Sequence, residues 1–502
     1  MRKGLIIRKF CKKPLIWCCT TYFAEGFPFT LIRTVSSVFF RNKNVSLESI
    51  GLTSLYGLPW VLKFLWAPYI DRFGTKRQWM LVMQIILATL FVFAGLLVPI
   101  NNGIICIAVV FLAGSVIAST HDIAIDGYYM EALDKNNQAK FVGYRVMAYR
   151  IGMMAGTGLI VTIGSTVGWL IAFICAGILL GTLFIWHLFF LKECETGKKP
   201  VVAMLRGFIK PQFFLGVVCC LSFVAGLKSF LNSETYLSLQ TRYSFLENIG
   251  FSGWTSVFLL LGLSGFAFYK KRGLACKRKM KNESFYSQAF LSFLDHGHIG
   301  FIISCIILLR TGEFLLSAMV SPFMVDLGIS NHYGWISALI GLPASIVGAL
   351  IGGSLISRYS LKKMVLPFLL AQNGTNIIYM GLAFFLENFV RINTGSVNPI
   401  FIGIGNLTVV ASVHGFDQFA GGLGTAILMT FLMQICRGKY KAAHYAIGSG
   451  LMSLSGLFTG VASGFLAARM GYGYFFGFSF ILSIPGMIMA IPAVKLLNEE
   501  KK

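Results

Sequence analysis

The sequence predicts an all-α polytopic membrane protein with two six-helix halves and two extra transmembrane helices between them, fourteen helices in total. Three observations lead to this fold class. Of the 502 residues, 56% are hydrophobic, which is above the share usual in soluble domains. Apolar runs of about 20 residues, the length that crosses a hydrocarbon core, recur along the whole chain. A charged loop signature between two such runs occurs twice.

Each apolar run is long enough to cross a bilayer as a helix. Helices are predicted because an open sheet edge leaves backbone groups without hydrogen-bond partners in lipid. In chain order the runs cover roughly 15–38, 49–70, 79–98, 104–128, 141–164, 169–191, 213–231, 249–269, 300–325, 333–356, 364–386, 402–434, 442–466 and 472–493.

The repeated loop signature indicates two homologous halves. Its copies, Ala67–Arg77 and Gly353–Lys363, lie 286 residues apart. Both read small-x-x-x-(Asp or Ser)-Arg-x-(Gly or Ser)-x-basic-basic, and each follows one apolar run and precedes the next. Repeated halves packed in a bilayer are a common design of secondary transporters.

The net charge of +24 is explained by membrane topology rather than by nucleic-acid binding. Most of the 43 Lys and Arg residues fall in segments that are cytosolic if the N-terminus is cytosolic, which is the positive-inside pattern. An even number of spans then places both termini in the cytosol. The cationic residues predicted outside are Arg41, Lys43, Arg242, Arg391 and Arg469.

Three segments are predicted along the chain. Residues 1–191 form an N-terminal six-helix bundle, and residues 300–502 form a C-terminal one. Residues 192–299 form a cytosolic linker that contains the two extra helices, 213–231 and 249–269. If only one of these crossed the membrane, the second half would invert and its basic loop would face outside, so either both cross or neither does. Both are predicted to cross, because Lys228 alone interrupts the first run and can snorkel near the outer end of that span.

Glycine ladders indicate close helix packing. Gly152-x-x-x-Gly156 lies in the fifth span, and a ladder of three glycines, Gly456, Gly460 and Gly464, lies in the eleventh. Both spans are the fifth of their half, which agrees with the duplication. Packing is the ordinary explanation of such ladders in membrane helices.

No chemical motif favours an enzyme. The chain has no phosphate-binding loop, zinc-ligand spacing or serine-nucleophile elbow, and its eleven cysteines include no C-x-x-C pair. We therefore expect no metal, no cofactor and no nucleic-acid partner, with the cysteines acting mainly as small buried hydrophobes.

Ionisable residues inside membrane spans are costly, so they usually face a cavity or a partner. Asp122 and Asp126 are four residues apart and lie on one helix face. Two nearby carboxylates resist double ionisation, which makes one of them a possible proton carrier. The alternative is a pair of structural salt bridges across the hairpin, Asp122 to Arg150 and Asp126 to Arg145. The proton-coupling candidates are Asp122, Asp126, Glu25, Glu313, Asp417 and His414.

The second half offers a similar set with similar alternatives. Arg310 and Glu313 are one turn apart, so they either neutralise each other or act separately. Arg33 and Arg310 are candidates for binding an anionic substrate because a guanidinium group forks onto a carboxylate or phosphate. His414 and Asp417 form either a proton relay or a hydrogen-bonded packing pair.

Several strings resemble one subgroup of a known superfamily. The repeated loop is similar to the cytosolic loop of the major facilitator superfamily. Glu25–Pro28, Lys63–Arg72, Asp122–Gly127, Gly143–Arg145 and Tyr149–Gly152 resemble strings of the AmpG muropeptide permeases and the related acetyl-CoA transporters. Val347–Gly353 and Gly421–Thr425 look like the same group. His414–Gln418 departs from the string usual in that group. The two extra helices also depart from the group, because they lie between the halves rather than after the second half.

The resemblance implies an importer of anhydromuropeptides, which are anionic cell-wall fragments, in the cytoplasmic membrane. It implies alternating access driven by protons, with the acidic pair carried by Asp122 and Asp126. We expect the protein to act as a monomer. Other anionic metabolites, such as acyl-CoA, nucleotide-linked solutes or siderophores, and a role as receptor or assembly factor are the alternatives. The substrate-binding candidates are Arg33, Arg150, Arg310, Tyr149 and His444. The conformational-switch candidates are Asp71, Arg72, Gly74, Lys76, Arg77, Arg358, Lys362 and Lys363.

Overall fold

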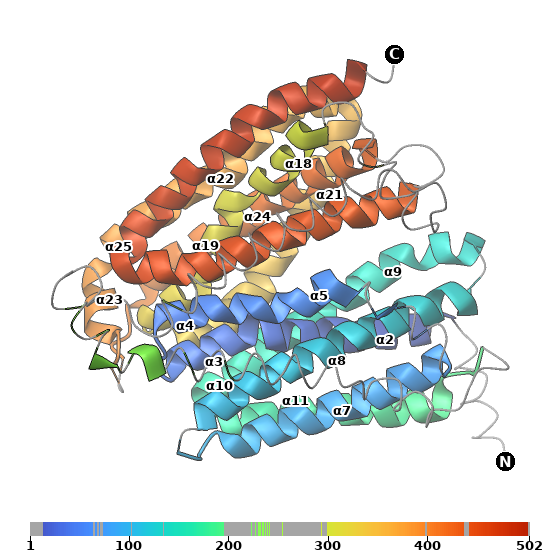
Figure 1. Cartoon of the computed structure of the whole chain (residues 1–502), viewed down its shortest axis with the longest axis horizontal. Helices are drawn as coiled ribbons and strands as arrows, with labels where there is room; N and C mark the ends of the chain where they lie inside the picture. The colour runs from blue at the N-terminus through green and yellow to red at the C-terminus, as the bar shows by residue number, and fades with distance from the viewer. Residues whose placement is uncertain are drawn as a thin grey trace. The chain divides into compact units, whose positions relative to one another are not determined.

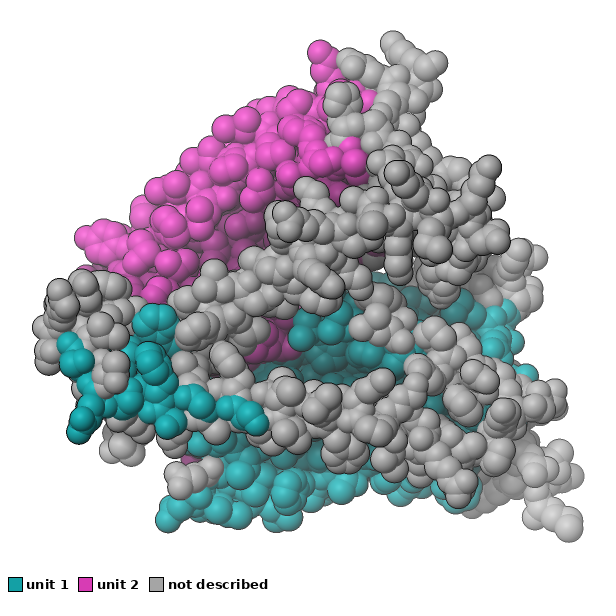
Figure 2. Space-filling model, viewed as in Figure 1, with its two compact units in different colours: residues 1–40, 56–255 teal, residues 41–55, 256–502 magenta. Residues whose placement is uncertain are grey.

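The computed structural model describes most of both predicted halves and little of the segment between them. The described residues are 14–63, 66–67, 70, 74–101, 103–133, 135–194, 222, 226, 229–231, 233–234, 236, 238, 240, 254, 293, 299–396, 399–435 and 441–499. They are almost entirely helical, and no strand occurs among them. Two compact units result, residues 1–40 with 56–255 and residues 41–55 with 256–502 (Figure 2).

Unit 1 is built around five long helices that lie alongside one another (Figure 1). Their bounds are α2 (Pro14–Thr30), α7 (Lys76–Leu97), α8 (Gly103–Ala132), α9 (Lys135–Met154) and α11 (Trp169–Phe190). Shorter elements complete it, namely the π-helix η1 (Leu31–Val35), α3 (Ser36–Asn42), η2 (Thr53–Gly57), α5 (Leu58–Leu62), the π-helix η4 (Ala155–Ile160) and α10 (Val161–Thr166). Both α3 and η2 continue into residues of unit 2.

Unit 2 packs its helices around a second apolar core. The elements are α4 (Leu47–Leu52), α18 (Ile299–Leu308), α19 (Thr311–Asp326), α20 (Ser330–Trp335), the π-helix η5 (Ile336–Gly341), α21 (Leu342–Tyr359), α22 (Leu361–Phe385), α23 (Glu387–Asn393), α24 (Ile404–Ile435) and α25 (Lys441–Glu499). Within this unit α21 packs on α24, and α25 packs on α19 and α22.

The predicted fold class is confirmed, while the count of fourteen spans stays a prediction. Nine helices in the described part of the chain are long and apolar enough to cross a membrane, or ten if the bent pair α22 and α23 is one span. The predicted second span is broken into α4, η2 and α5. The predicted spans 442–466 and 472–493 form the single element α25, which is interrupted at Gly471 with a φ of 73°.

Three predicted features lie wholly or mostly outside the described residues. They are the two extra spans, 213–231 and 249–269, and the loop residues Asp71 and Arg72. The boundaries predicted at 191 and 300 remain a prediction, although α11 ends at Phe190 and α18 begins at Ile299.

The two copies of the loop signature share an unusual backbone conformation. Gly74 has a φ of 63°, and Ser360, at the matching position of the second copy, has a φ of 76°. Each residue comes shortly before a helix, α7 in the first copy and α22 in the second. Side chains rarely adopt this left-handed conformation, so its recurrence supports a common origin of the two loops.

The glycine ladder of the fifth span packs against α2, as predicted. A methyl group on Gly152 would lie 2.5 Å from the backbone oxygen of Phe23, and one on Gly156 would collide with the side chain of Thr30. The ladder of α25 acts in the same way in unit 2. Methyl groups on Gly460 and Gly464 would collide with Ser54 and with the backbone of α4.

Substituting Gly26 by alanine is expected to destabilise unit 1. A methyl group there collides with the backbone oxygen of Tyr149 on α9, and a backbone atom cannot turn away. We expect a loss of about 1–3 kcal/mol, the usual range for overpacking. Equilibrium unfolding in mixed micelles measures it. Gly181→Ala is the matched control, because nothing lies within 4 Å of a methyl group at that helical position. Equal stability of the two variants would contradict close packing of α2 on α9.

Candidate functional site

A buried cluster of two acids and one cation lies among α2, α5 and α8. Lys63, which follows α5, donates a hydrogen bond to Oδ2 of Asp122 on α8. Glu25 of α2 lies within hydrogen-bonding range of the same carboxyl group. Oε2 of Glu25 is buried and has no hydrogen-bond partner among the described residues. Two carboxyl groups therefore share one ammonium group, and a proton on one acid balances the cluster.

Tyr149 of α9 connects this cluster to two guanidinium groups. Its hydroxyl interacts electrostatically with Glu25 and Asp122, and also with Arg33 and Arg150. Acids that can hold a proton and guanidinium groups that can bind an anion are thus gathered around one side chain. The structure brings together five of the predicted site residues, which come from three predicted spans.

Local backbone features position Arg33. Pro28 lies inside α2, and the π-helix η1, which carries Arg33, follows directly. Such π-helical turns are frequent at functional sites. The guanidinium group of Arg33 lies against Gly57, where any side chain would collide with it. The glycine therefore makes the room that Arg33 occupies.

Aromatic rings lie beside the same group of residues. The ring of Phe29 on α2 lies 5.2 Å from that of Trp60 on α5 and 5.9 Å from that of Tyr149 on α9. Aromatic faces of this kind suit the apolar parts of a bulky solute, while the charged groups nearby suit its polar parts.

Asp126 belongs to a separate pair. It accepts a hydrogen bond of 2.7 Å from the hydroxyl of Tyr22 and lies 3.5 Å from the guanidinium group of Arg145. Arg145 also lies over the rings of Tyr22 and Tyr129, 4.8 Å and 5.2 Å from their centres. Of the two salt bridges that were the alternative to proton sites, the one between Asp126 and Arg145 forms. The one between Asp122 and Arg150 does not occur among the described residues, where Asp122 pairs with Lys63 instead.

In unit 2 the pairing of Arg310 with Glu313 is the alternative that the structure supports. Arg310 donates hydrogen bonds to both carboxylate oxygens of Glu313, and the one from its Nε to Oε2 is 2.5 Å long. Gln372 of α22 donates a further hydrogen bond to Oε2. Arg310 therefore has an internal partner in this state.

His414 and Asp417 contact different neighbours on α22. His414 lies with its Nδ1 3.0 Å from the hydroxyl of Tyr379. Asp417 lies with its Oδ1 2.7 Å from the hydroxyl of Thr375. No direct hydrogen bond joins the two in the described part of the chain, so neither a direct proton relay nor a hydrogen-bonded pair of His414 and Asp417 is present in this state. His444 is buried, and its ring lies 5.6 Å from that of Phe293.

The basic residues at the end of the first loop contact the neighbouring helices α8 and α11. Arg77 at the start of α7 donates hydrogen bonds of 2.8 Å and 2.7 Å to the backbone oxygens of Leu191 and Leu188, which end α11. Cationic side chains commonly satisfy the last carbonyl groups of a helix in this way. Lys76 is buried, and its side chain lies against Gly127 of α8. In the second copy Arg358, Lys362 and Lys363 are exposed.

A buried ion pair in unit 2 was not predicted from the sequence. Arg41, predicted to lie in an external segment, is 9% exposed and donates hydrogen bonds of 2.6 Å and 2.5 Å to the two carboxylate oxygens of Asp326. Tyr472 donates a third hydrogen bond, of 2.6 Å, to the same carboxylate. The available signal was the place of Asp326, one residue beyond the predicted span 300–325.

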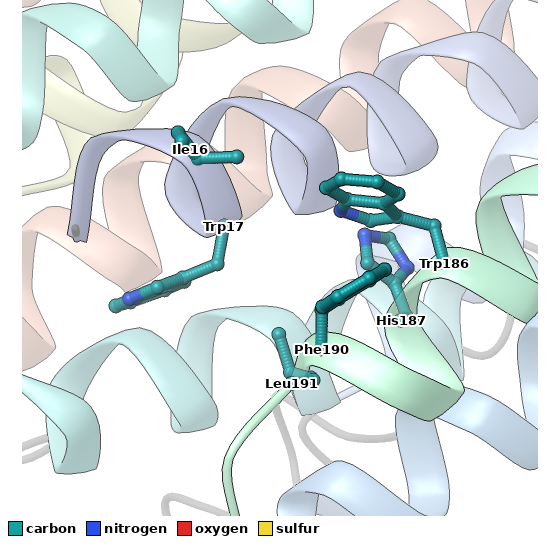
Figure 3. Close-up of a pocket in the computed structure, with 6 residues that line it drawn as sticks. All are labelled: Ile16, Trp17, Trp186, His187, Phe190 and Leu191. Atoms are coloured by element: carbon teal, nitrogen blue, oxygen red, sulfur yellow. The ribbon is translucent and has the colours of Figure 1, made fainter. Parts of the chain in front are cut away.

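The small cavity drawn in Figure 3 is not a substrate site. It lies between α2 and α11, and its space for water-sized molecules is about 10 Å³, enough for about one water molecule. His187 in its wall lies with Nδ1 2.8 Å from the side-chain oxygen of Gln84. The lining residues are Ile16, Trp17, Trp186, His187, Phe190 and Leu191.

Comparison with known families decides the class of the protein. The profile of the Major Facilitator Superfamily matches residues 18–280, slightly more than half of the chain. The chain belongs to the Major Facilitator Superfamily. It is accordingly a multi-pass membrane transporter protein rather than an enzyme, as predicted.

Relatives in this superfamily cover nearly the whole chain. The anhydromuropeptide permease of Escherichia coli (strain K12) is 23% identical over 482 residues, which are 93% of this chain and 77% of the permease. A transporter named AmpG 1 from Rickettsia prowazekii (strain Madrid E) is 22% identical over 491 residues, 95% of this chain and 97% of that protein. The predicted similarity to the AmpG group is confirmed.

Solved structures of other transporters share the fold. A POT family transporter in complex with 5-aminolevulinic acid aligns with a TM-score of 0.62 at 13% identity, over 97% of this chain and 96% of that one. The xylose transporter XylE from E. coli aligns with a TM-score of 0.56 at 12% identity, over 95% and 94% of the two chains. At these identities the likeness supports the fold alone.

Proposed function

We propose that this member of the superfamily is a proton-coupled secondary transporter that imports anhydromuropeptides across the cytoplasmic membrane by alternating access. The substrate class is supported by the similarity to the E. coli permease of that name along nearly the whole chain. The protein functions as a monomer with both termini in the cytosol, in line with its positive-inside charge pattern.

The observation that carries the proposal is the cluster of Glu25, Asp122 and Lys63 in unit 1. Two acids that share one cation can bind one proton, and they release it when their electrostatic surroundings change. A conformational cycle that exposes this cluster to the two sides of the membrane in turn converts a proton gradient into work.

Arg33 and Arg150 are the proposed contacts for the acidic groups of the cargo. Both lie near Tyr149, whose hydroxyl also interacts with Glu25 and Asp122. A guanidinium group binds a carboxylate through two parallel hydrogen bonds, which gives geometric specificity as well as affinity. Because the same tyrosine is near the acids and the guanidinium groups, cargo binding and proton binding influence each other electrostatically.

Uptake into proteoliposomes tests the proposal. With the membrane potential clamped at zero and the outside one pH unit more acidic, labelled anhydromuropeptide is expected to accumulate at least about tenfold. One pH unit is worth about 1.4 kcal/mol per proton, which is a factor of ten in concentration. The controls are a protonophore, which should abolish accumulation, and liposomes without protein.

Two outcomes would contradict the proposal in different ways. Entry of anhydromuropeptide that is independent of the gradient would remove proton coupling. Gradient-driven accumulation of acyl-CoA, a nucleotide-linked solute or a siderophore, without that of anhydromuropeptide, would replace the substrate. Absence of transport for all four would favour a receptor or assembly factor.

A further inference from the structure

Asp417 of α24 is a buried carboxyl group without a cation in contact. It is 9% exposed. Its hydrogen-bonding neighbours are both neutral, Thr375 at 2.7 Å from Oδ1 and the amide of Gln418 at 3.2 Å from Oδ2. No ion pair of Asp417 occurs among the described residues. A buried carboxylate without a counter-ion is unfavourable, so a bound proton is the simplest way to neutralise it.

The ionisable groups around Asp417 do not supply a counter-ion. Glu313 of α19 interacts with it unfavourably and is itself held by Arg310. Tyr379 of α22 lies within electrostatic range and contacts His414, the nearest ionisable residue on α24 itself. Arg310 is thus already engaged with the other acid.

The hydroxyl of Thr375 indicates where the proton lies. Its oxygen is 2.7 Å from Oδ1 of Asp417 and also 2.7 Å from the backbone oxygen of Gln372. A threonine hydroxyl has a single hydrogen, so it can donate to one of these two oxygens only. Both short contacts are hydrogen bonds if Oδ1 carries a proton and donates it to Thr375, whose own hydrogen goes to Gln372. Oδ2 then accepts from Gln418.

We infer that Asp417 is a second proton-binding site, so that each transport cycle moves two protons, one on the Glu25 and Asp122 cluster of unit 1 and one on Asp417 of unit 2. This inference rests on the proposed function and adds its stoichiometry. When the proton leaves Oδ1, the hydroxyl of Thr375 turns to donate to the carboxylate and releases the backbone oxygen of Gln372. Proton release is therefore linked to a local change on α22, which also carries Gln372, the hydrogen-bond donor to Glu313.

The accumulation ratio at a fixed pH difference measures the stoichiometry. With zero membrane potential and one pH unit across the membrane, the wild type is expected to accumulate labelled anhydromuropeptide about 100-fold and Asp417→Asn about tenfold. Asp417→Glu should restore most of the difference. Equal ratios in the wild type and Asp417→Asn would overturn the inference. Glu387→Gln is the control for substituting an acid, because Glu387 forms an exposed pair with Arg391.

Infrared spectroscopy gives a readout that needs no transport. The purified wild type at neutral pH should show the carbonyl band of a protonated carboxylic acid that Asp417→Asn lacks, and Thr375→Val should shift this band by removing its acceptor. If the wild type lacks the band, or if the band is unchanged in both variants, the inference fails even where uptake is gradient-driven. If the band behaves as expected and no gradient-driven uptake occurs, the proposed function fails and Asp417 remains a proton-binding site.

Discussion

Replacing Asp122 by asparagine is expected to lower gradient-driven accumulation about tenfold while the protein still inserts and folds. In the wild type Lys63 is shared between Asp122 and Glu25. In the variant Glu25 becomes the single carboxyl partner of Lys63, the two charges balance, and no proton is needed. The accumulation ratio at one pH unit should fall about tenfold relative to the wild type, because one proton fewer moves with each cargo molecule.

Exchange of labelled for unlabelled substrate separates a coupling defect from a folding defect. Exchange needs cargo binding and conformational change without net proton movement, so Asp122→Asn should keep it. Asp122→Glu, which retains a carboxyl group, should keep part of the accumulation as well. Normal accumulation by Asp122→Asn would move the proton site of unit 1 to another group.

Replacing Asp326 by asparagine is expected to be the most destabilising polar substitution in unit 2. It leaves the guanidinium group of Arg41 buried without an opposite charge, where the wild type has two short hydrogen bonds to Asp326 and a third from Tyr472. Breaking a buried pair in this way costs about 3–5 kcal/mol. The free energy of unfolding in mixed micelles, compared with that of the wild type, measures the loss.

Two further variants show that the loss comes from the unpaired charge. Arg41→Met combined with Asp326→Leu should recover much of the stability, because an apolar pair of similar volume often replaces a buried ion pair without loss. Glu387→Gln breaks an exposed pair with Arg391 and should have no measurable effect. If the double variant loses as much stability as Asp326→Asn, the loss does not come from the unpaired charge of Arg41.

Among the candidate site residues, the sequence indicated which charged groups lie within the bundles more reliably than it indicated which groups they contact. The pairing of Asp126 with Arg145 follows from the geometry of one hairpin, in which neighbouring helices run antiparallel from a short loop. The pairing of Lys63 with Asp122 joins positions 59 residues apart on α5 and α8, and it depends on how these two helices pack. Contacts within a helical hairpin can be predicted from residue numbers, whereas contacts between helices that are distant in the sequence cannot.

The membrane-spanning fold and the duplication were both determined by local sequence patterns. A run of apolar residues crosses a bilayer because of its own length and composition, and a loop signature is a short contiguous string. The shared left-handed backbone of Gly74 and Ser360 agrees with that duplication. Which acids share a cation and which stand without one was decided by the tertiary structure alone. The rotation and depth of each helix decide whether Asp417 meets a threonine or an arginine, and these depend on packing against the rest of its bundle.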